Sequence, residues 1–308
     1  MTDHSPTREP GSRVALVTCA DLPDLDPDDR LLRSALRARS VDVTAAVWDD
    51  PRRDWSGFHL VVLRSPWDYP ARRPRFLAWA SGVEADGVRL ANPADVIAWN
   101  TDKRYLSTLA EAGVPVVPTD WVPHGDLWHL PTDGEWVIKP AVSAGSKDTG
   151  RYRLDEAEHR RLAAAHVARL QRQQRLVMVQ PYLPAVESYG ETGLIFLADA
   201  ARGELAYSHA IRKGPMLTGP DRPIEGLFVA EQITARTPSE AEVALARQVL
   251  AAVPGGSAGL LYARVDLIPG PDGAPVLVEL ELTEPSLFLG YATGAADRLA
   301  DAICSLAG

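Results

Sequence analysis

Three carboxylates near the end of the chain have the spacing of a metal site. Glu279 and Glu281 stand two residues apart in the strand-like run VLVELEL, so their side chains point to the same face. Asp266 lies in a second strand-like run, and the PGPDG turn at residues 269–273 predicts that the two runs form a hairpin. Clustered carboxylates repel each other unless a cation bridges them, and oxygen ligands suit Mg²⁺. We therefore expect a magnesium site; the alternative is a solvated strand face.

Cationic side chains accompany this acidic patch. Arg264 stands two residues before the first of the three carboxylates, and Arg212 and Lys213 end another predicted strand. An arginine beside a metal-bound phosphate can hold a phosphoryl or acyl-phosphate oxygen with two hydrogen bonds. Alternatively, Arg264 pairs with a neighbouring acid. Glu284 is a fourth candidate ligand, although Pro285 beside it indicates that the strand has already ended.

A lysine followed by a loop of small residues predicts a phosphate-binding segment. Lys139 lies near the end of the strand-like run at residues 135–142, and the loop at residues 143–150 is rich in serine and glycine. An ammonium group beside exposed backbone N–H groups can bind a polyphosphate. The chain has no G-x-x-x-x-G-K-[ST] motif, so this segment is not a P-loop. The alternative is a strand-end lysine before an ordinary surface loop.

The stretch after another predicted strand is a candidate for the purine end of a nucleotide site. Gln180, Tyr182 and Leu183 close the strand-like run RLVMVQPYL and offer backbone groups and an apolar wall. Glu187 could accept hydrogen bonds from ribose hydroxyls.

The elements that would position these residues change character along the chain. Strand-like runs at residues 13–19, 41–48 and 58–65 are separated by helical patterns, which predicts a parallel sheet with helical crossovers. A helix that Thr101 caps and Gly113 ends opens the next region. Long strand pairs follow and predict antiparallel sheets. The predicted fold class is an α/β N-terminal domain followed by an α+β region.

Composition and charge exclude other classes of function. The chain has 308 residues, with 41 acidic against 32 basic side chains and a formal net charge of −9, so it lacks the basic surface that nucleic-acid binding requires. Its two cysteines, Cys19 and Cys304, cannot form a disulfide framework or a cysteine-based zinc site. No apolar run approaches the ~20 residues that span a bilayer, and the polar start lacks a signal peptide's apolar core. We expect a cytoplasmic protein with no nucleic-acid or membrane partner.

Taken in chain order, the segments from about residue 100 onward resemble the ATP-grasp superfamily. The resemblance implies that Lys103 in NTDK and Lys139 in VIKP are the two nucleotide-binding lysines and that Arg264 stabilises an acyl phosphate. It implies ATP and Mg²⁺ as cofactors, with Asp266, Glu279 and Glu281 as the metal ligands. The implied ATP contacts are Lys103, Lys139, Ser143, Gly145, Ser146, Gln180, Tyr182, Leu183 and Glu187.

Two positions depart from the superfamily's pattern. Many members have asparagine where this chain has Glu281, and a glutamate often stands where this chain has Gln180. The first departure adds negative charge and should still allow Mg²⁺ to bind. The resemblance also implies a division into a tail, an α/β substrate domain, a lid subdomain and a metal-binding subdomain, over residues 1–12, 13–99, 100–183 and 184–308.

A narrower resemblance covers most of the chain. The segments VTCADLPDLDPDD, LVVLRSPWDY, YSHAIRKGP and ELELTEPSLFL are similar to a bacterial ATP-grasp group that includes the cyclo-ligase acting on O-ureido-serine in cycloserine biosynthesis. This resemblance implies an ATP-dependent ligase that joins a carboxylate to an amine through an acyl phosphate, within one small amino-acid derivative. The alternatives are an intermolecular amide or peptide ligase and a non-catalytic ATP-binding protein.

Such a mechanism assigns further roles. Arg212 or Lys213 would help Arg264 to stabilise the acyl phosphate and the oxyanion formed on attack. Substrate contacts should come from the loops that follow the N-terminal strands, because open parallel sheets bind ligands beyond their carboxyl ends. The candidates are Arg64 for a carboxylate, Asp68 and Asp21 for an ammonium, and Trp67 and Tyr69 as walls. The reaction needs no nucleophilic side chain, so we expect Cys19 to be a buried residue at the end of a strand. The partner we consider for the whole chain is a second copy, in a homodimer.

Overall fold

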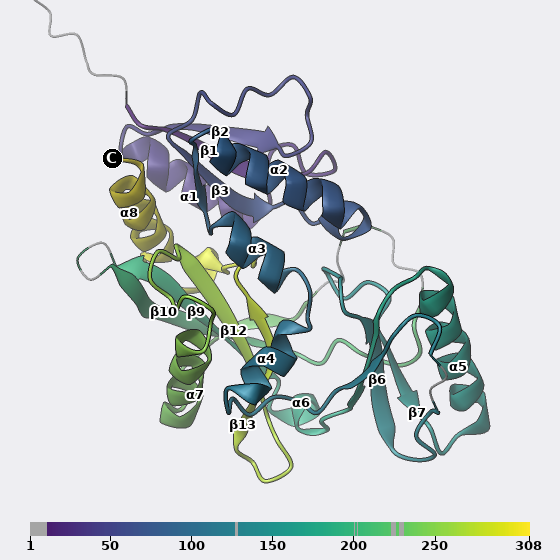
Figure 1. Ribbon diagram of the computed structural model, residues 1–308. Helices are drawn as coiled ribbons and strands as arrows, with labels where there is room; N and C mark the ends of the chain where they lie inside the picture. The colour runs from purple at the N-terminus through teal and green to yellow at the C-terminus, as the bar shows by residue number, and fades with distance from the viewer. Residues whose placement is uncertain (1–10, 127–128, 200, 202, 223–225, 228–230) are drawn as a thin grey trace, which may run out of the picture.

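Three β-sheets organise the part of the chain that the computed structural model describes, residues 11–126, 129–199, 201, 203–222, 226–227 and 231–308 (Figure 1). The strands are β1 (Arg13–Thr18), β2 (Asp42–Val47), β3 (Leu60–Ser65), β4 (Arg89–Ala91), β5 (Asp120–Val122), β6 (Glu135–Pro140), β7 (Gly150–Arg153), β8 (Val177–Pro181), β9 (Glu191–Asp199), β10 (Glu204–Lys213), β11 (Ile233–Arg236), β12 (Tyr262–Pro269) and β13 (Pro275–Glu281). The α-helices are α1 (Pro27–Ala38), α2 (Arg73–Ala85), α3 (Ala94–Asn100), α4 (Tyr105–Glu111), α5 (Ala157–Arg172), α6 (Ala185–Ser188), α7 (Glu240–Ala251) and α8 (Ala295–Ala307), and the 3₁₀ helices are η1 (Tyr69–Arg72) and η2 (Leu289–Tyr291).

The first sheet is parallel, in the order β2-β1-β3-β4, as the alternation of strand and helix patterns predicts. Helices cover both of its faces, so the central residues of β1, 14–17, are all apolar and buried. Val14 and Leu16 pack toward α1 and α8, whereas Ala15 and Val17 pack toward α2. Cys19, directly after β1, is fully buried, as expected.

The largest sheet has the order β11-β10-β9-β12-β13 and is antiparallel, as predicted. The PGPDG turn joins β12 and β13 as a hairpin, with Gly273 in the left-handed region at φ 82°. This register sets Asp266 directly opposite Glu279 and Arg264 directly opposite Glu281. The chemistry-bearing residues of the two strands therefore share one face.

The third sheet, in the order β5-β8-β6-β7, forms a lid beside the largest sheet, and α5 packs on it (Figure 1). His166 on α5 is buried here and its Nδ1 lies 2.8 Å from the Tyr152 hydroxyl. The histidine pairs at 124/129 and 159/166 have spacings that do not suit a zinc site, and the sequence predicts that they lie on the surface. His166 is an exception, because α5 directs its side chain into the core of the lid.

The helix predicted after Thr101 begins later than its pattern suggests. Thr101 instead closes α3, where its hydroxyl donates to the Ile97 carbonyl at 2.8 Å, and α4 starts only at Tyr105; Gly113 follows its end, as predicted. Asn100 explains the break, because its side chain bonds the backbone of β13 at Leu280 and Leu282.

The domain boundaries stay predictions. Because α4 packs in the core of the largest sheet, we propose that the lid begins near β5 rather than at residue 100. None of the described helices is both long and apolar enough to span a membrane.

Candidate active site

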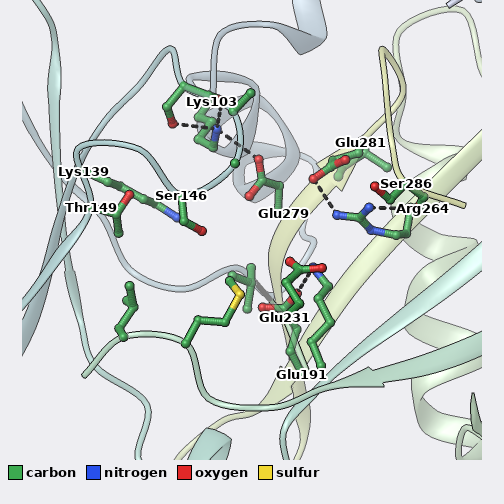
Figure 2. A pocket seen from close by; sticks show the side chains of 18 of the residues that line it. Lys103, Lys139, Ser146, Thr149, Glu191, Glu231, Arg264, Glu279, Glu281 and Ser286 are labelled. Carbon is green, nitrogen blue, oxygen red and sulfur yellow. Dashed lines mark hydrogen bonds and ion pairs between the residues drawn. The ribbon is translucent and has the colours of Figure 1, made fainter. Parts of the chain in front are cut away.

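A cavity of about 660 Å³ lies where the lid, the largest sheet and the loops of the first sheet meet. Figure 2 shows its centre, where Lys103 and Lys139 face Glu279, Glu281 and Arg264. Residues predicted from sequence that line the cavity are Lys103, Lys139, Ser143, Gly145, Ser146, Gln180, Tyr182, Leu183, Lys213, Arg264, Glu279, Glu281, Trp67 and Tyr69. The structure therefore brings together segments that are far apart in sequence.

The two predicted nucleotide-binding lysines have different surroundings. The Lys103 ammonium donates to the Ser143 carbonyl at 3.0 Å and forms an ion pair with Glu279 at 3.0 Å. The Lys139 ammonium has no hydrogen bond or ion pair with any described residue, and burial lowers its pKa. A buried ammonium without an anionic partner is unfavourable unless a ligand supplies the negative charge.

The predicted phosphate loop follows β6 and lines the cavity. Gly145 and Ser146 are consecutive residues in the left-handed region, with φ of 62° and 58°, which turns the loop toward Lys139. Asp148 anchors the loop to the lid helix through Arg169 at 2.7 Å, and it also pairs with Arg175. Ser143 is held from the other side by Lys103. The loop is thus ordered at both ends while its tip faces the cavity.

The purine wall is formed by three of the four residues predicted for it. Gln180, Tyr182 and Leu183 line the cavity, and the Gln180 amide donates to the Thr119 hydroxyl at 2.8 Å. Glu187 is not among the described residues that line the cavity, and its contact with ribose stays a prediction. It accepts a hydrogen bond from the Tyr182 hydroxyl at 2.7 Å and pairs with Arg151, because α6 carries its side chain behind the wall.

The three predicted metal ligands do not have equal access to the cavity. Glu279 and Glu281 open into it, but Asp266 is only 1% exposed and lies behind Arg264 (2.9 Å) and Lys213 (2.7 Å). Burial alone would raise the pKa of Asp266, but these two cations hold it well below its usual value. Within the described residues, no three acidic, histidine or cysteine side chains are arranged to hold a metal ion. Metal binding by Asp266 stays a prediction, and Glu279 and Glu281 are the two of the three carboxylates that open into the cavity.

The remaining pair fits Mg²⁺. Burial raises the pKa of Glu281 to about 7, and the neighbouring Glu279 and Asp266 charges add to this against the effect of Arg264. Burial thus disfavours the ionised form of Glu281. A divalent cation, which takes oxygen ligands, would stabilise the ionised pair.

Arg212 and Lys213 point in opposite directions from the end of β10. Lys213 is buried and pairs with Asp266 and with Glu191, whereas the Arg212 Nε donates to the Tyr189 carbonyl at 2.8 Å outside the cavity. Neighbouring residues of a strand point to opposite faces, so Lys213 enters the cavity and Arg212 does not; a role for Arg212 in the reaction stays a prediction. Glu191 is a cavity residue that the sequence did not reveal; burial raises its pKa to about 7 in spite of Lys213.

Three of the residues predicted to contact the substrate are not among the described residues that line the cavity. Arg64 is fully buried, pairs with Asp29 at 2.7 Å and donates to the Pro285 carbonyl at 2.9 Å, and Asp68 accepts a hydrogen bond from the Trp48 indole at 2.8 Å. Asp21 is exposed. The contacts of these three residues with a substrate stay predictions.

Glu284, which the end of the strand made doubtful as a metal ligand, lines the cavity. Burial raises its pKa to about 8, with a further contribution from the Glu281 charge. The Trp67 indole donates to the Glu284 carbonyl at 3.1 Å. Asp26 and Asp28, at the start of α1, line the same end of the cavity and were also missed, because they read as helix-capping residues.

Comparison with known proteins agrees with this architecture. The structure of the ATP-grasp ligase PsnB complexed with minimal precursor, Mg and ADP has a TM-score of 0.58 at 20% identity and covers 96% of this chain and 98% of that one. This likeness shows that the chain shares the fold of that ligase.

Closer relatives narrow the class. Residues 14–92 match the family model for the N-terminal domain of D-cycloserine synthetase DcsG. The chain is 38% identical over 302 residues to the cycloserine biosynthesis protein DcsG of Streptomyces lavendulae, covering 94% of this chain and 97% of the relative. The crystal structure of D-cycloserine synthetase DcsG has a TM-score of 0.83 at 37% identity over 96% of this chain and 100% of that one. The chain belongs to the DcsG family of ATP-grasp ligases.

Proposed function

We propose that this ligase uses Mg-ATP to activate the carboxylate of a small amino-acid derivative and then closes a ring within the same molecule, in cycloserine biosynthesis. The observation that supports this best is a single cavity in which an unpartnered buried ammonium, Lys139, faces two open carboxylates and Arg264. The name of the Streptomyces relative supports the pathway. The substrate class we propose is O-ureido-serine.

The nucleotide would lie between the lid and the largest sheet. Its base would pack between Gln180 and Leu183, and its phosphates would lie against Lys103, Lys139 and the tip of the phosphate loop. Glu279 and Glu281 are the residues we assign to Mg²⁺. When bound, the metal would neutralise phosphate charge and orient the oxygens for in-line transfer.

The reaction that this arrangement supports has two steps. In the first, a substrate carboxylate oxygen bonds to the γ-phosphorus and ADP leaves. In the second, a nitrogen of the same molecule bonds to the acyl carbon, loses a proton and expels phosphate. Arg264 would hold the acyl phosphate and stabilise the oxyanion, while Lys213 acts through Asp266 as a positioning residue for that guanidinium. Ring closure needs only the folded conformer of one substrate.

Release of ADP across a substrate panel tests the proposal. D- and L-O-ureido-serine and ordinary amino acids would be assayed with Mg-ATP, singly and in pairs. Glu279→Gln sets the catalytic background, and Glu204→Gln, an exposed site on β10, controls for the loss of a carboxylate. Turnover of one compound into a lighter product supports the cyclo-ligase. Turnover only with pairs indicates an intermolecular ligase, and ADP release no higher than that of Glu279→Gln refutes a catalytic role with these substrates.

A further inference from the structure

Glu284 differs from three other cavity carboxylates, Glu191, Glu279 and Glu281, by its lack of an ion pair. Glu191 pairs with Lys213, Glu279 with Lys103 and Glu281 with Arg264. Glu284, three residues beyond Glu281, forms no ion pair with any lysine, arginine or histidine that the structure describes. A carboxylate inside a cavity is stable as an anion only when something supplies the opposite charge.

The surroundings of Glu284 hold it in place. The Trp67 indole donates to its backbone carbonyl at 3.1 Å, and the hydroxyl of the buried Tyr69 lies beside its carboxylate. Tyr69 is itself fixed by stacking on Phe76, with ring centroids 4.8 Å apart. Trp67, Tyr69 and Glu284 thus line one corner of the cavity together.

The position of this corner relative to the reaction centre restricts which cation it could bind. In an α-amino acid, the ammonium nitrogen is two bonds from the carboxylate carbon, so its partner must lie close to the carboxylate that is activated. Glu284 meets this condition because it follows Glu281 by three residues and lines the same cavity as Glu279 and Glu281. Two other acids line this end of the cavity. Asp26 accepts from the N–H of Asp28 at 2.9 Å, and Asp28 Oδ1 accepts from the N–H of Gly290 at 3.1 Å, while Asp28 Oδ2 is buried without a hydrogen bond to any described residue.

We propose that Glu284 binds the α-ammonium group of the substrate, with Trp67 and Tyr69 as its walls; this assignment rests on the proposed function. The consequence is chemical, because a nitrogen held as ammonium has no lone pair and cannot attack the acyl phosphate. The attacking nitrogen must then be a second, uncharged one in the side chain. The site would accept zwitterionic α-amino acids with such a nitrogen and would reject ligation through the α-amine.

A pair of ligands that differ only in the amine tests this assignment. The probes are O-ureido-serine and its des-amino analogue, 3-(ureidooxy)propanoic acid, and binding of each is measured by calorimetry with Mg²⁺ and a non-hydrolysable ATP analogue. For the natural chain we expect loss of the amine to weaken binding about 30- to 100-fold. Glu284→Gln should weaken the binding of O-ureido-serine by a similar factor and should change the binding of the analogue by less than about threefold. The KM for ATP should not change.

Further variants separate this role from others. Glu284→Asp keeps the charge and should retain part of the difference in affinity between the two probes. Tyr69→Phe should retain most of that difference. Equal weakening of both probes by Glu284→Gln would show a structural role, and a changed Mg²⁺ requirement for ADP release would show a metal ligand; either result overturns the assignment. Failure of the natural chain to distinguish the probes overturns it as well. Discrimination without ADP release would instead refute the proposed function and leave the ammonium site standing.

Discussion

Two groups of charged side chains in the cavity differ in how their charge is compensated. Lys103 and Arg264 are paired with Glu279 and Glu281, so charges that must later contact phosphate and metal are stabilised before either arrives. Lys139 and Glu284, by contrast, form no ion pair with any described residue. Because an unpaired buried charge is costly, the comparison suggests a rule for this molecule. Paired charges hold the site in shape, and unpaired ones mark where a ligand supplies the missing charge.

Replacing Lys213 by methionine should have the largest effect on stability. Lys213 is 5% exposed and pairs with both Asp266 and Glu191, so its loss leaves buried negative charge without compensation. We expect the free energy of unfolding to fall by about 3–5 kcal/mol. Urea unfolding of Lys213→Met against the natural chain measures this. Unchanged stability would show that paired charges do not hold this end of the site together.

Replacing Lys139 by methionine should not lower the stability of the protein. Its ammonium is equally buried but unpartnered, so methionine removes an unfavourable charge and fills a similar volume. We expect unchanged or higher stability, together with a fall in kcat/KM for ATP of about 10²–10³-fold. Denaturation and ADP release measured on the same preparation check both. A loss of stability comparable to that of Lys213→Met would remove the distinction between paired and unpaired charges.

The pH dependence of stability sharpens the comparison at Glu284. Its folded pKa, about 8, lies above the ordinary value of 4.5, so the folded state binds this proton more tightly than the unfolded chain does. The stability that the protonated carboxyl contributes is fully present below pH 4.5 and is lost as the pH rises through 8. Glutamine cannot ionise, so Glu284→Gln should gain about 1–3 kcal/mol relative to the natural chain between pH 5 and pH 8. Urea titrations of the ligand-free protein at several pH values measure this difference, and a constant difference would contradict the assigned pKa.

The same contrast explains how much could be predicted from sequence. Lys103, Lys139, Glu279 and Glu281 line the cavity as expected, because strand periodicity and local motifs determine where they point. The hairpin and the alternating βα units were predictable for the same reason.

The structure differs from the sequence-based expectations where a residue distant in the sequence determines the contacts of a side chain. Arg64 was expected at the substrate, but it pairs with Asp29, which is 35 residues away in the sequence and on another element. Asp266 was expected to bind metal, but in the structure it is enclosed by Arg264 and Lys213. The sequence does not show with which acid these cations form ion pairs. Glu284 follows the end of a strand, where no periodicity indicates its direction.

The smallest effect we predict concerns how the lid is held over the phosphate end. Arg169 on α5 pairs with Asp148 in the phosphate loop and with Asp221 in the segment after β10, both at 2.7 Å. Arg169 thus joins the two loops that enclose this end. Its side chain is one-third exposed, so solvent screens each pair and the whole contribution is about 1 kcal/mol or less.

Arg169→Gln should therefore raise the KM for ATP about three- to fivefold and leave kcat nearly unchanged, because the loops open more readily while the reacting groups keep their geometry. Arg161→Gln is the matched control, since this arginine lies on the same helix and pairs only with the exposed Glu158. Steady-state ADP release at varied ATP distinguishes the two. If Arg169→Gln lowered kcat instead, the loops would be positioning the reacting groups and not merely retaining the nucleotide. The phosphate end would then depend on its outer pairs as strongly as on those around Lys213.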